Sequence, residues 1–254
     1  MNIDEHLVSL DDAGKRLAAA AASAGPDAPV PSCPEWVVRD LVRHQGGVHR
    51  WATGYVSVPH TEYWDIDLDE IVGSWPADSD LVEWFTEGHA ALIGALRSAS
   101  PDLACWSFLA APSPLAMWSR RQAHETTIHR VDAELAAGWE PTVIPPAFAA
   151  DGVDELVSCF ITRPGGRLKA DPARVLRITC TDISGDWLVS IGPNGVTTTH
   201  VGEGQLSESD CQISGTANDL YLTLWNRKPP TGIAIAGDAG VVDLFADGVK
   251  IRWS

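Results

Sequence analysis

The sequence predicts an α+β protein of two domains, in which a helical bundle is followed by a smaller domain of strands and helices. From residue 1 to about residue 140, apolar residues recur at helical spacing and no strand pattern is present. A proline-rich stretch at 140–146, EPTVIPP, then interrupts this pattern. Beyond it, alternating and β-branched residues are typical of strands. We therefore place the first domain at 1–141 and the second at 147–254.

The first two helices are predicted on either side of a rigid connector. Apolar residues at helical spacing begin at Ile3 and stop near Gly25, where Gly-Pro ends the helix. The connector APVPSCPEW contains three prolines, which block a helix. Ser32 is the expected N-cap of the second helix, because Glu35 follows it three residues later as in a capping box. This helix should continue to about Tyr55.

Two further helices complete the first domain. Residues 57–79 are rich in Pro, Gly, Trp and Asp and are expected to form a loop. A third apolar helical face covers 81–96, and a fourth covers 115–137 and closes at Gly138. Four helices with no strand between them predict a four-helix bundle.

The second half mixes the two kinds of secondary structure, which is the pattern of an α+β domain. A hairpin turn is indicated by Gly-Pro-Asn-Gly at 192–195. The expected elements, in order, are a helix at 147–162, strands at 175–180, 187–192 and 196–201, a helix at 216–226, a short apolar segment at 232–237, a helix at 240–247 and a strand at 249–253.

Composition and charge restrict the classes of partner. The 254 residues include 34 acidic and 18 basic side chains, which gives a formal net charge of −16. Nucleic acids and anionic membranes attract basic proteins, so this balance argues against both as partners. No apolar run reaches the roughly 18 residues needed to span a bilayer, and the acidic N-terminus is unlike a secretory signal. Five scattered cysteines, an odd number without a CxxC pair, favour a reducing cytoplasm.

Two of the predicted bundle helices contain a pattern of metal-ligand residues. Glu125 and His129 stand at i, i+4 on the fourth helix, so their side chains project from one face about one turn apart. This spacing lets a carboxylate oxygen and an imidazole nitrogen reach one metal ion. His49, on the second helix, is the natural third ligand. Two His and one Glu form a set typical of catalytic zinc sites, which helical bundles commonly host.

Alternatives to this site follow from the same residues. A His/Glu pair at this spacing also occurs as a solvent-facing hydrogen-bonded pair. The segment HETTIH is not the HExxH motif of metalloproteases, because Ile128 occupies the second His position. His44 and His124 are expected to lie off the ligand face, and either to be structural or to support a ligand without binding the metal. Asp132 is expected either to orient an imidazole or to be a surface charge.

Other catalytic patterns are missing from the sequence. It contains no GxGxxG, no P-loop and no GxSxG, so dinucleotide, nucleotide and serine-hydrolase chemistry are not supported.

Five segments resemble segments of one known family. VPSCPEWVVRDLVRHQGGVHRW, at 30–51, resembles the signature of the mycothiol-dependent maleylpyruvate isomerase family, and HETTIHRVDAELAAG, at 124–138, resembles its Glu-x-x-x-His-x-x-Asp segment. ANDLYLTLWNR, GIAIAGD and KIRW resemble segments of its small C-terminal domain. The resemblance covers nearly the whole chain. It implies a DinB-like metal-binding four-helix bundle joined to an α+β domain similar to sterol-carrier folds.

The resemblance also implies a reaction. The expected protein is a cytoplasmic enzyme that holds zinc, or another divalent metal, through His49, Glu125 and His129. Mycothiol is the expected cosubstrate, and its thiolate would add to an electrophilic small molecule in an isomerase or a thiol S-transferase reaction. Arg227 matches a recurrent Arg of the C-terminal domain and is expected to bind a substrate carboxylate; an exposed Arg at a helix end is the alternative.

Two other interpretations stay open at this point. The chain could be a non-catalytic ligand-binding or regulatory member of the family, or a hydrolase in which metal-bound water replaces the thiol. The sequence leaves the electrophile unidentified, and it allows a monomer or a homodimer.

Overall fold

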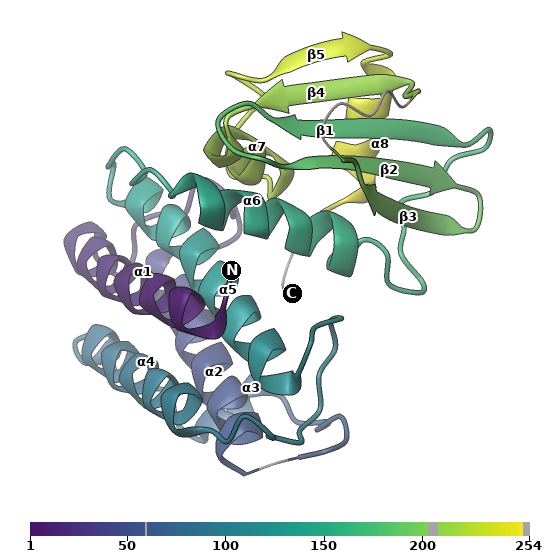
Figure 1. Ribbon diagram of the computed structural model, residues 1–254. Helices are drawn as coiled ribbons and strands as arrows, with labels where there is room; N and C mark the ends of the chain where they lie inside the picture. Colours follow the sequence, from purple (N-terminus) through teal and green to yellow (C-terminus); the bar gives the residue numbers. More distant parts are fainter. Residues whose placement is uncertain (59, 203–207, 251–254) are drawn as a thin grey trace. The chain divides into compact units, whose positions relative to one another are not determined.

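The computed structural model of the protein describes residues 1–58, 60–202 and 208–250. The chain divides into two compact units, Met1–Thr142 and Val143–Ser254. The first is helical and the second combines a sheet with helices (Figure 1), which confirms the α+β class and the two-domain architecture. None of the described helices has both the length and the apolar character that crossing a bilayer requires.

The first unit is the expected bundle of four long helices. These are α1 (Ile3–Ala24), α2 (Val38–Ser57), α4 (Leu81–Ser98) and α5 (Pro114–Ala136). Helix α1 packs against α4 and α5, and α2 packs against the same two helices, so each long helix has two main neighbours. The segment predicted as a loop also contains a short helix, α3 (Leu68–Val72).

Helix α5 is buried on nearly all sides. Ser113 caps its N-terminus by accepting a hydrogen bond from the Ala116 backbone N–H, and Pro114 occupies its first turn. From Arg121 to Glu134 every side chain is buried, including many polar and charged ones. Because buried polar groups must find partners inside the protein, this helix is the centre of an internal polar network.

The predicted start of the second helix is wrong. Helix α2 begins at Val38, and residues 31–35 form turns before it. Asp40 accepts the Val37 backbone N–H at 3.0 Å and so supplies the capping interaction that we assigned to Ser32 and Glu35. The Ser32 hydroxyl instead donates to Asp132 Oδ1 at 2.5 Å, which fixes the connector to α5. Ser32 therefore bonds across the bundle to α5, and Asp40 provides the cap of α2.

The described residues of the second unit form a five-stranded mixed sheet of order β3-β2-β1-β4-β5. All neighbouring strands are antiparallel except β1 and β4, which are parallel. The hairpin turn joins β2 to β3 as predicted. Strand β4, which the sequence pattern does not predict, is short and lies next to the central strand. The strands are β1 (Arg174–Cys180), β2 (Asp186–Gly192), β3 (Gly195–His200), β4 (Cys211–Gly215) and β5 (Ala234–Gly237).

Helices cover one face of this sheet (Figure 1). Leu176 and Ile178 of β1 are buried beneath them, whereas Arg177 between them is only half-buried. Residues 251–253 of the predicted final strand lie outside the described residues. The helices are α6 (Pro146–Asp154) with its π-helical extension η1 (Glu155–Phe160), α7 (Ala217–Leu224) and α8 (Gly240–Gly248).

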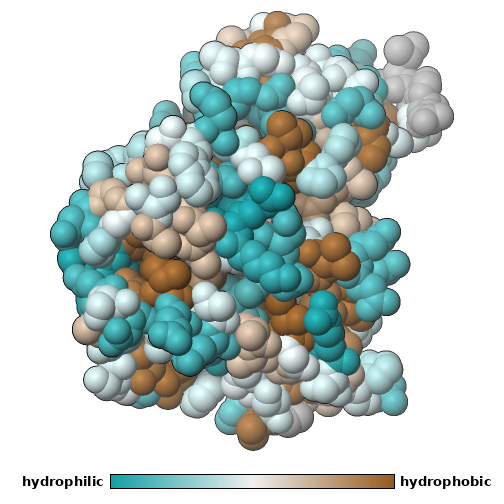
Figure 2. All heavy atoms as spheres, turned by 90° about the vertical axis from the view of Figure 1, so that its left-hand side faces the viewer, coloured by the Kyte–Doolittle hydropathy of each residue, from teal (hydrophilic) through white to brown (hydrophobic). Residues whose placement is uncertain are grey.

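The face of the protein drawn in Figure 2 is mixed in polarity. On the side drawn in Figure 2, hydrophilic residues (teal) surround smaller hydrophobic patches (brown). Isolated apolar side chains are normal on such a surface. The polar residues buried in α5 are the more informative feature.

Candidate metal centre

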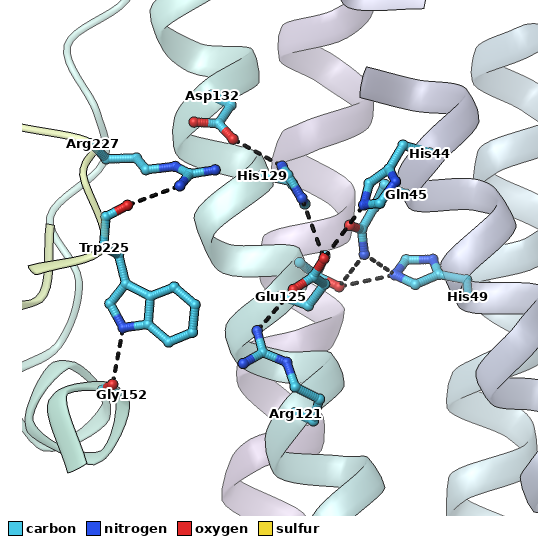
Figure 3. A network of polar contacts seen from close by, with 11 residues as sticks. His44, Gln45, His49, Arg121, Glu125, His129, Asp132, Gly152, Trp225 and Arg227 are labelled. Atoms are coloured by element: carbon cyan, nitrogen blue, oxygen red, sulfur yellow. Dashed lines mark hydrogen bonds and ion pairs between the residues drawn. The ribbon is translucent and has the colours of Figure 1, made fainter. Parts of the chain in front are cut away.

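Helices α2 and α5 bring three metal-ligand side chains together inside the first unit. The carboxylate atom Glu125 Oε1 lies 3.3 Å from His129 Nε2 and 3.5 Å from His44 Nε2. One ligand atom from each of these residues lies within 4.8 Å of the other two. Figure 3 shows the two imidazoles directed toward the carboxylate from either side. Glu125 and His129 are thus neighbours as their i, i+4 spacing predicted.

The chemistry and spacing of these atoms fit a divalent metal ion. Zinc binds His nitrogen and carboxylate oxygen at about 2.0–2.2 Å, so two tetrahedral ligands should be about 3.4 Å apart. The separations of 3.3 and 3.5 Å agree with this edge length. Glu125 Oε1 is buried and lacks a well-aligned hydrogen bond within the described residues. An ion between these atoms would satisfy it.

The second nitrogen of His129 is held by a carboxylate. His129 Nδ1 lies 2.8 Å from Asp132 Oδ2, and Asp132 also accepts the Ser32 hydroxyl. A proton on Nδ1 leaves the Nε2 lone pair directed at Glu125, as in the carboxylate–histidine–metal arrangement of many metalloproteins. Asp132 is fully buried, so the surface-charge alternative for it is wrong. Glu125 and His129 are also buried, which excludes a solvent-facing pair.

An aromatic side chain from the connector packs against both imidazoles. The Trp36 ring is stacked on His129 with 6.0 Å between centroids and is tilted against His44 at 5.0 Å. The Ser32 hydrogen bond and the Trp36 contacts both join the segment before α2 to the end of α5 that bears His129.

Charges around the site keep the carboxylate ionised. Burial alone would raise the pKa of Glu125, but the Arg121 charge and the neighbouring imidazoles of His129 and His44 hold it well below its ordinary value. Arg121 Nη2 donates to Glu125 Oε2 at 2.9 Å. Burial would likewise lower the pKa of His129, yet its bonds to Asp132 and Glu125 outweigh burial and raise it. Burial lowers the pKa of His44.

The structure places His49 outside this group. His49 Nε2 lies 2.8 Å from Gln45 Nε2 and 2.9 Å from Thr126 Oγ1, and its ring packs against Phe85. Its side chain is fully buried, and burial lowers its pKa well below the ordinary value. Of the three predicted ligands, the structure therefore gathers Glu125 and His129, and His44 stands where we expected His49.

Helical periodicity could not have separated these two histidines. Residues five positions apart differ by about 140° around a helix, so only one of them can face a given neighbour. His49 is fully buried and only 12% of the His44 side chain is exposed, so both lie in the bundle interior. The deciding feature is the rotation of α2 about its own axis, which helical periodicity does not determine.

Two other residues singled out from the sequence lie apart from these ligands. His124 is buried on α5 and its ring packs edge-on against His6 at 6.0 Å, which fits a structural role. Arg227 belongs to the second unit, where it follows α7 and is half-buried. Its Nη1 atom donates to the Trp225 carbonyl at 2.8 Å. Its binding of a substrate carboxylate stays a prediction.

Comparisons with known proteins give the same family for both units. The family model for the mycothiol maleylpyruvate isomerase N-terminal domain matches residues 7–134. The model for the MDMPI C-terminal domain matches residues 147–244. A search of curated proteins finds no match.

Solved structures share the fold at low sequence identity. The crystal structure of a mycothiol-dependent maleylpyruvate isomerase is 15% identical, covers 93% of both chains and gives a TM-score of 0.63. A mutant of such an isomerase has the same identity and coverage, with a TM-score of 0.62. The likeness extends over both units.

Proposed function

Because the chain belongs to the mycothiol maleylpyruvate isomerase family, we propose that it is an enzyme that uses mycothiol. Its thiolate would add to an electrophilic small molecule, as expected from the sequence. The observation that supports this function most strongly is the buried group of His44, Glu125 and His129. Burying polar groups costs free energy of folding, because they lose their water. A catalytic role explains such a buried cluster better than a stabilising role does.

Three side chains would hold a divalent metal, zinc being the expected ion. We assign this role to His44, Glu125 and His129, and so replace His49 of the set expected from the sequence. When bound there, the metal would supply a Lewis acid that favours the thiolate form of mycothiol at neutral pH. Asp132 orients His129, and Arg121 holds the second oxygen of Glu125.

The reaction that we propose is a cis–trans isomerisation. The thiol would supply a sulfur that adds to one carbon of a cis-enoyl double bond, while the electron pair of that double bond moves toward the adjacent carbonyl. Rotation about the resulting single bond and expulsion of the same sulfur would then give the trans isomer and regenerate the thiol. If the adduct is released instead, the protein is a thiol S-transferase. Arg227 would bind a carboxylate of the substrate.

An activity assay with and without the thiol tests this function. Purified protein should convert maleylpyruvate, or a related cis-enoyl acid, only when mycothiol is added. Mass spectrometry separates an isomer from a thiol conjugate. Turnover without the thiol and with gain of water would support the hydrolase instead. No turnover of any electrophile by the metal-loaded protein would support a binding or regulatory role.

Metal analysis of two histidine variants tests the ligand assignment. With metal in excess, wild-type protein should retain about one divalent ion per chain after desalting. His44→Gln should lose most of it, because a ligand is removed, whereas His49→Gln should keep it. The opposite pattern, with metal lost only from His49→Gln, would restore the original trio and refute the assignment of His44.

A further inference from the structure

Three buried polar side chains form a closed triangle of hydrogen bonds beside the candidate metal centre. Gln45 Nε2 lies 2.8 Å from His49 Nε2 and 3.0 Å from Thr126 Oγ1, and the last two atoms are 2.9 Å apart. Figure 3 shows Gln45 and His49 beside Glu125. We call these three residues the triangle.

The triangle joins the two helices at the positions next to two proposed ligands. Gln45 follows His44 on α2, and Thr126 follows Glu125 on α5. His49 lies one turn further along α2, and its Nε2 atom contacts both of the others. A bond between Gln45 and Thr126 therefore ties the backbone that carries one ligand to the backbone that carries the other.

The three contacts are consistent with a neutral His49. If the Gln45 amide donates one N–H to His49 Nε2 and the other to Thr126 Oγ1, then Nε2 accepts and the ring is neutral with its proton on Nδ1. Its Nε2 lone pair is then occupied by hydrogen bonds. This is the atom that would otherwise be directed at a metal.

Keeping such a cluster in the bundle is costly. All three side chains are fully buried. His49 Nδ1 and Gln45 Oε1 find no hydrogen-bond partner among the residues that the structure describes. A polar network that is only partly satisfied stabilises a core less than apolar side chains of similar size would. Its presence is better explained by what it does to the neighbouring ligands.

We propose that the triangle positions the metal ligands by fixing the rotation of α2 against α5, with His49 as its central positioning residue. The triangle thereby sets the distance between His44 Nε2 and Glu125 Oε1. This inference rests on the proposed function. Residues that orient metal ligands through hydrogen bonds change metal affinity by 10–100-fold, roughly, when they are mutated.

Removal of one hydroxyl group tests this role with little change of shape. Thr126→Val deletes the hydroxyl and keeps the volume, whereas Thr126→Ser keeps the hydroxyl. Thr127→Val, at the next buried position of the same helix, is the matched control. Each metal-free protein is titrated with Co²⁺, and both the affinity and the ligand-field absorption of the bound ion are recorded.

We expect Thr126→Val to bind one Co²⁺ with an affinity about 10–100-fold lower and with a shifted absorption spectrum. Thr126→Ser and Thr127→Val should bind it like the wild type. A purely structural role would lower the stability of the metal-free protein and leave the spectrum of bound Co²⁺ unchanged. That result, or an unchanged affinity in Thr126→Val, would overturn the inference.

A second pair of variants covers the possibility that Thr126→Val does not fold. In His49→Gln the new side chain can still hydrogen-bond to Gln45 and Thr126, so this variant should keep much of the wild-type affinity for Co²⁺. His49→Leu cannot form these bonds and should bind Co²⁺ more weakly. Equal affinities in these two variants would also overturn the inference. If the wild-type protein bound no Co²⁺, the proposed metal centre would itself be refuted. If the wild type bound Co²⁺ and the variants bound it equally well, only the role of the triangle would be refuted.

Discussion

His44 and His49 show how one residue's role depends on its surroundings. Both are histidines of α2 in the bundle interior, yet one nitrogen of His44 faces Glu125 whereas the equivalent nitrogen of His49 is hydrogen-bonded by Gln45 and Thr126. The i, i+4 rule was sufficient for Glu125 and His129, because both lie on the same helix. It could not choose a partner from another helix, because that choice depends on how the helices pack.

His89 gives a pH prediction at the residue scale. Burial lowers the pKa of His89, so the unfolded chain, with a His pKa of about 6.5, binds the proton more readily. The unfolding free energy must therefore fall as the pH drops below about 6.5. His89→Leu removes this contribution, so its stability should depend less on pH, by at most about 1.4 kcal/mol per pH unit.

Urea unfolding of metal-free wild type and His89→Leu at several values between about pH 5 and pH 7 measures this difference. His44 and His49 also have lowered pKa values and contribute in both proteins. Two stability curves that run parallel over this range would show that His89 is protonated equally in the folded and unfolded states.

At the scale of elements, the sequence was most informative where a pattern is local. The four long helices, the hairpin turn and three of the strands follow from periodicity and turn residues. The start of α2 was missed because Ser32 bonds to Asp132, 100 positions away. Strand β4 was missed because it is only 5 residues long and pairs with β1 across a long crossover. Neither long-range contact leaves a local pattern.

Two adjacent glycines of α2 provide a paired test of helix packing. A Cβ on Gly46 would lie 2.2 Å from the Trp84 ring. The Arg50 guanidinium lies over this ring and limits its movement. A Cβ on Gly47 would lie 3.1 Å from a terminal methyl of Leu68. Alanine at either site favours the helix by about 1 kcal/mol. At Gly46, overpacking costing about 1–3 kcal/mol should outweigh this gain.

We therefore expect Gly46→Ala to unfold at lower urea concentration than wild type and Gly47→Ala to be neutral or more stable. The measurement is the unfolding midpoint of each variant under identical conditions. Equal midpoints for Gly46→Ala and Gly47→Ala would show that the Trp84 ring moves aside at little cost.

At the scale of the whole molecule, the proposed function uses residues of both units. The first unit contains the residues proposed to hold the metal, and the second contains Arg227. If Arg227 binds a substrate carboxylate, Arg227→Met should lower kcat/KM by at least about 30-fold, because a buried Arg–carboxylate contact contributes about 2–5 kcal/mol. Its metal content should equal that of the wild type.

Kinetics and metal analysis on the same preparation of Arg227→Met separate these effects. Loss of metal together with activity would mean that the variant disturbs the first unit or the fold. Unchanged kcat/KM would leave the second unit without a role in substrate binding.

The central claim is that His44, Glu125 and His129 form a metal centre that binds the thiolate of mycothiol. The most direct measurement is a titration of Co²⁺-loaded protein with mycothiol, followed by absorption spectroscopy and by proton release. Thiolate ligation predicts a sulfur-to-cobalt charge-transfer band and release of about one proton per chain. A spectrum that mycothiol leaves unchanged, with no proton released, would contradict the account.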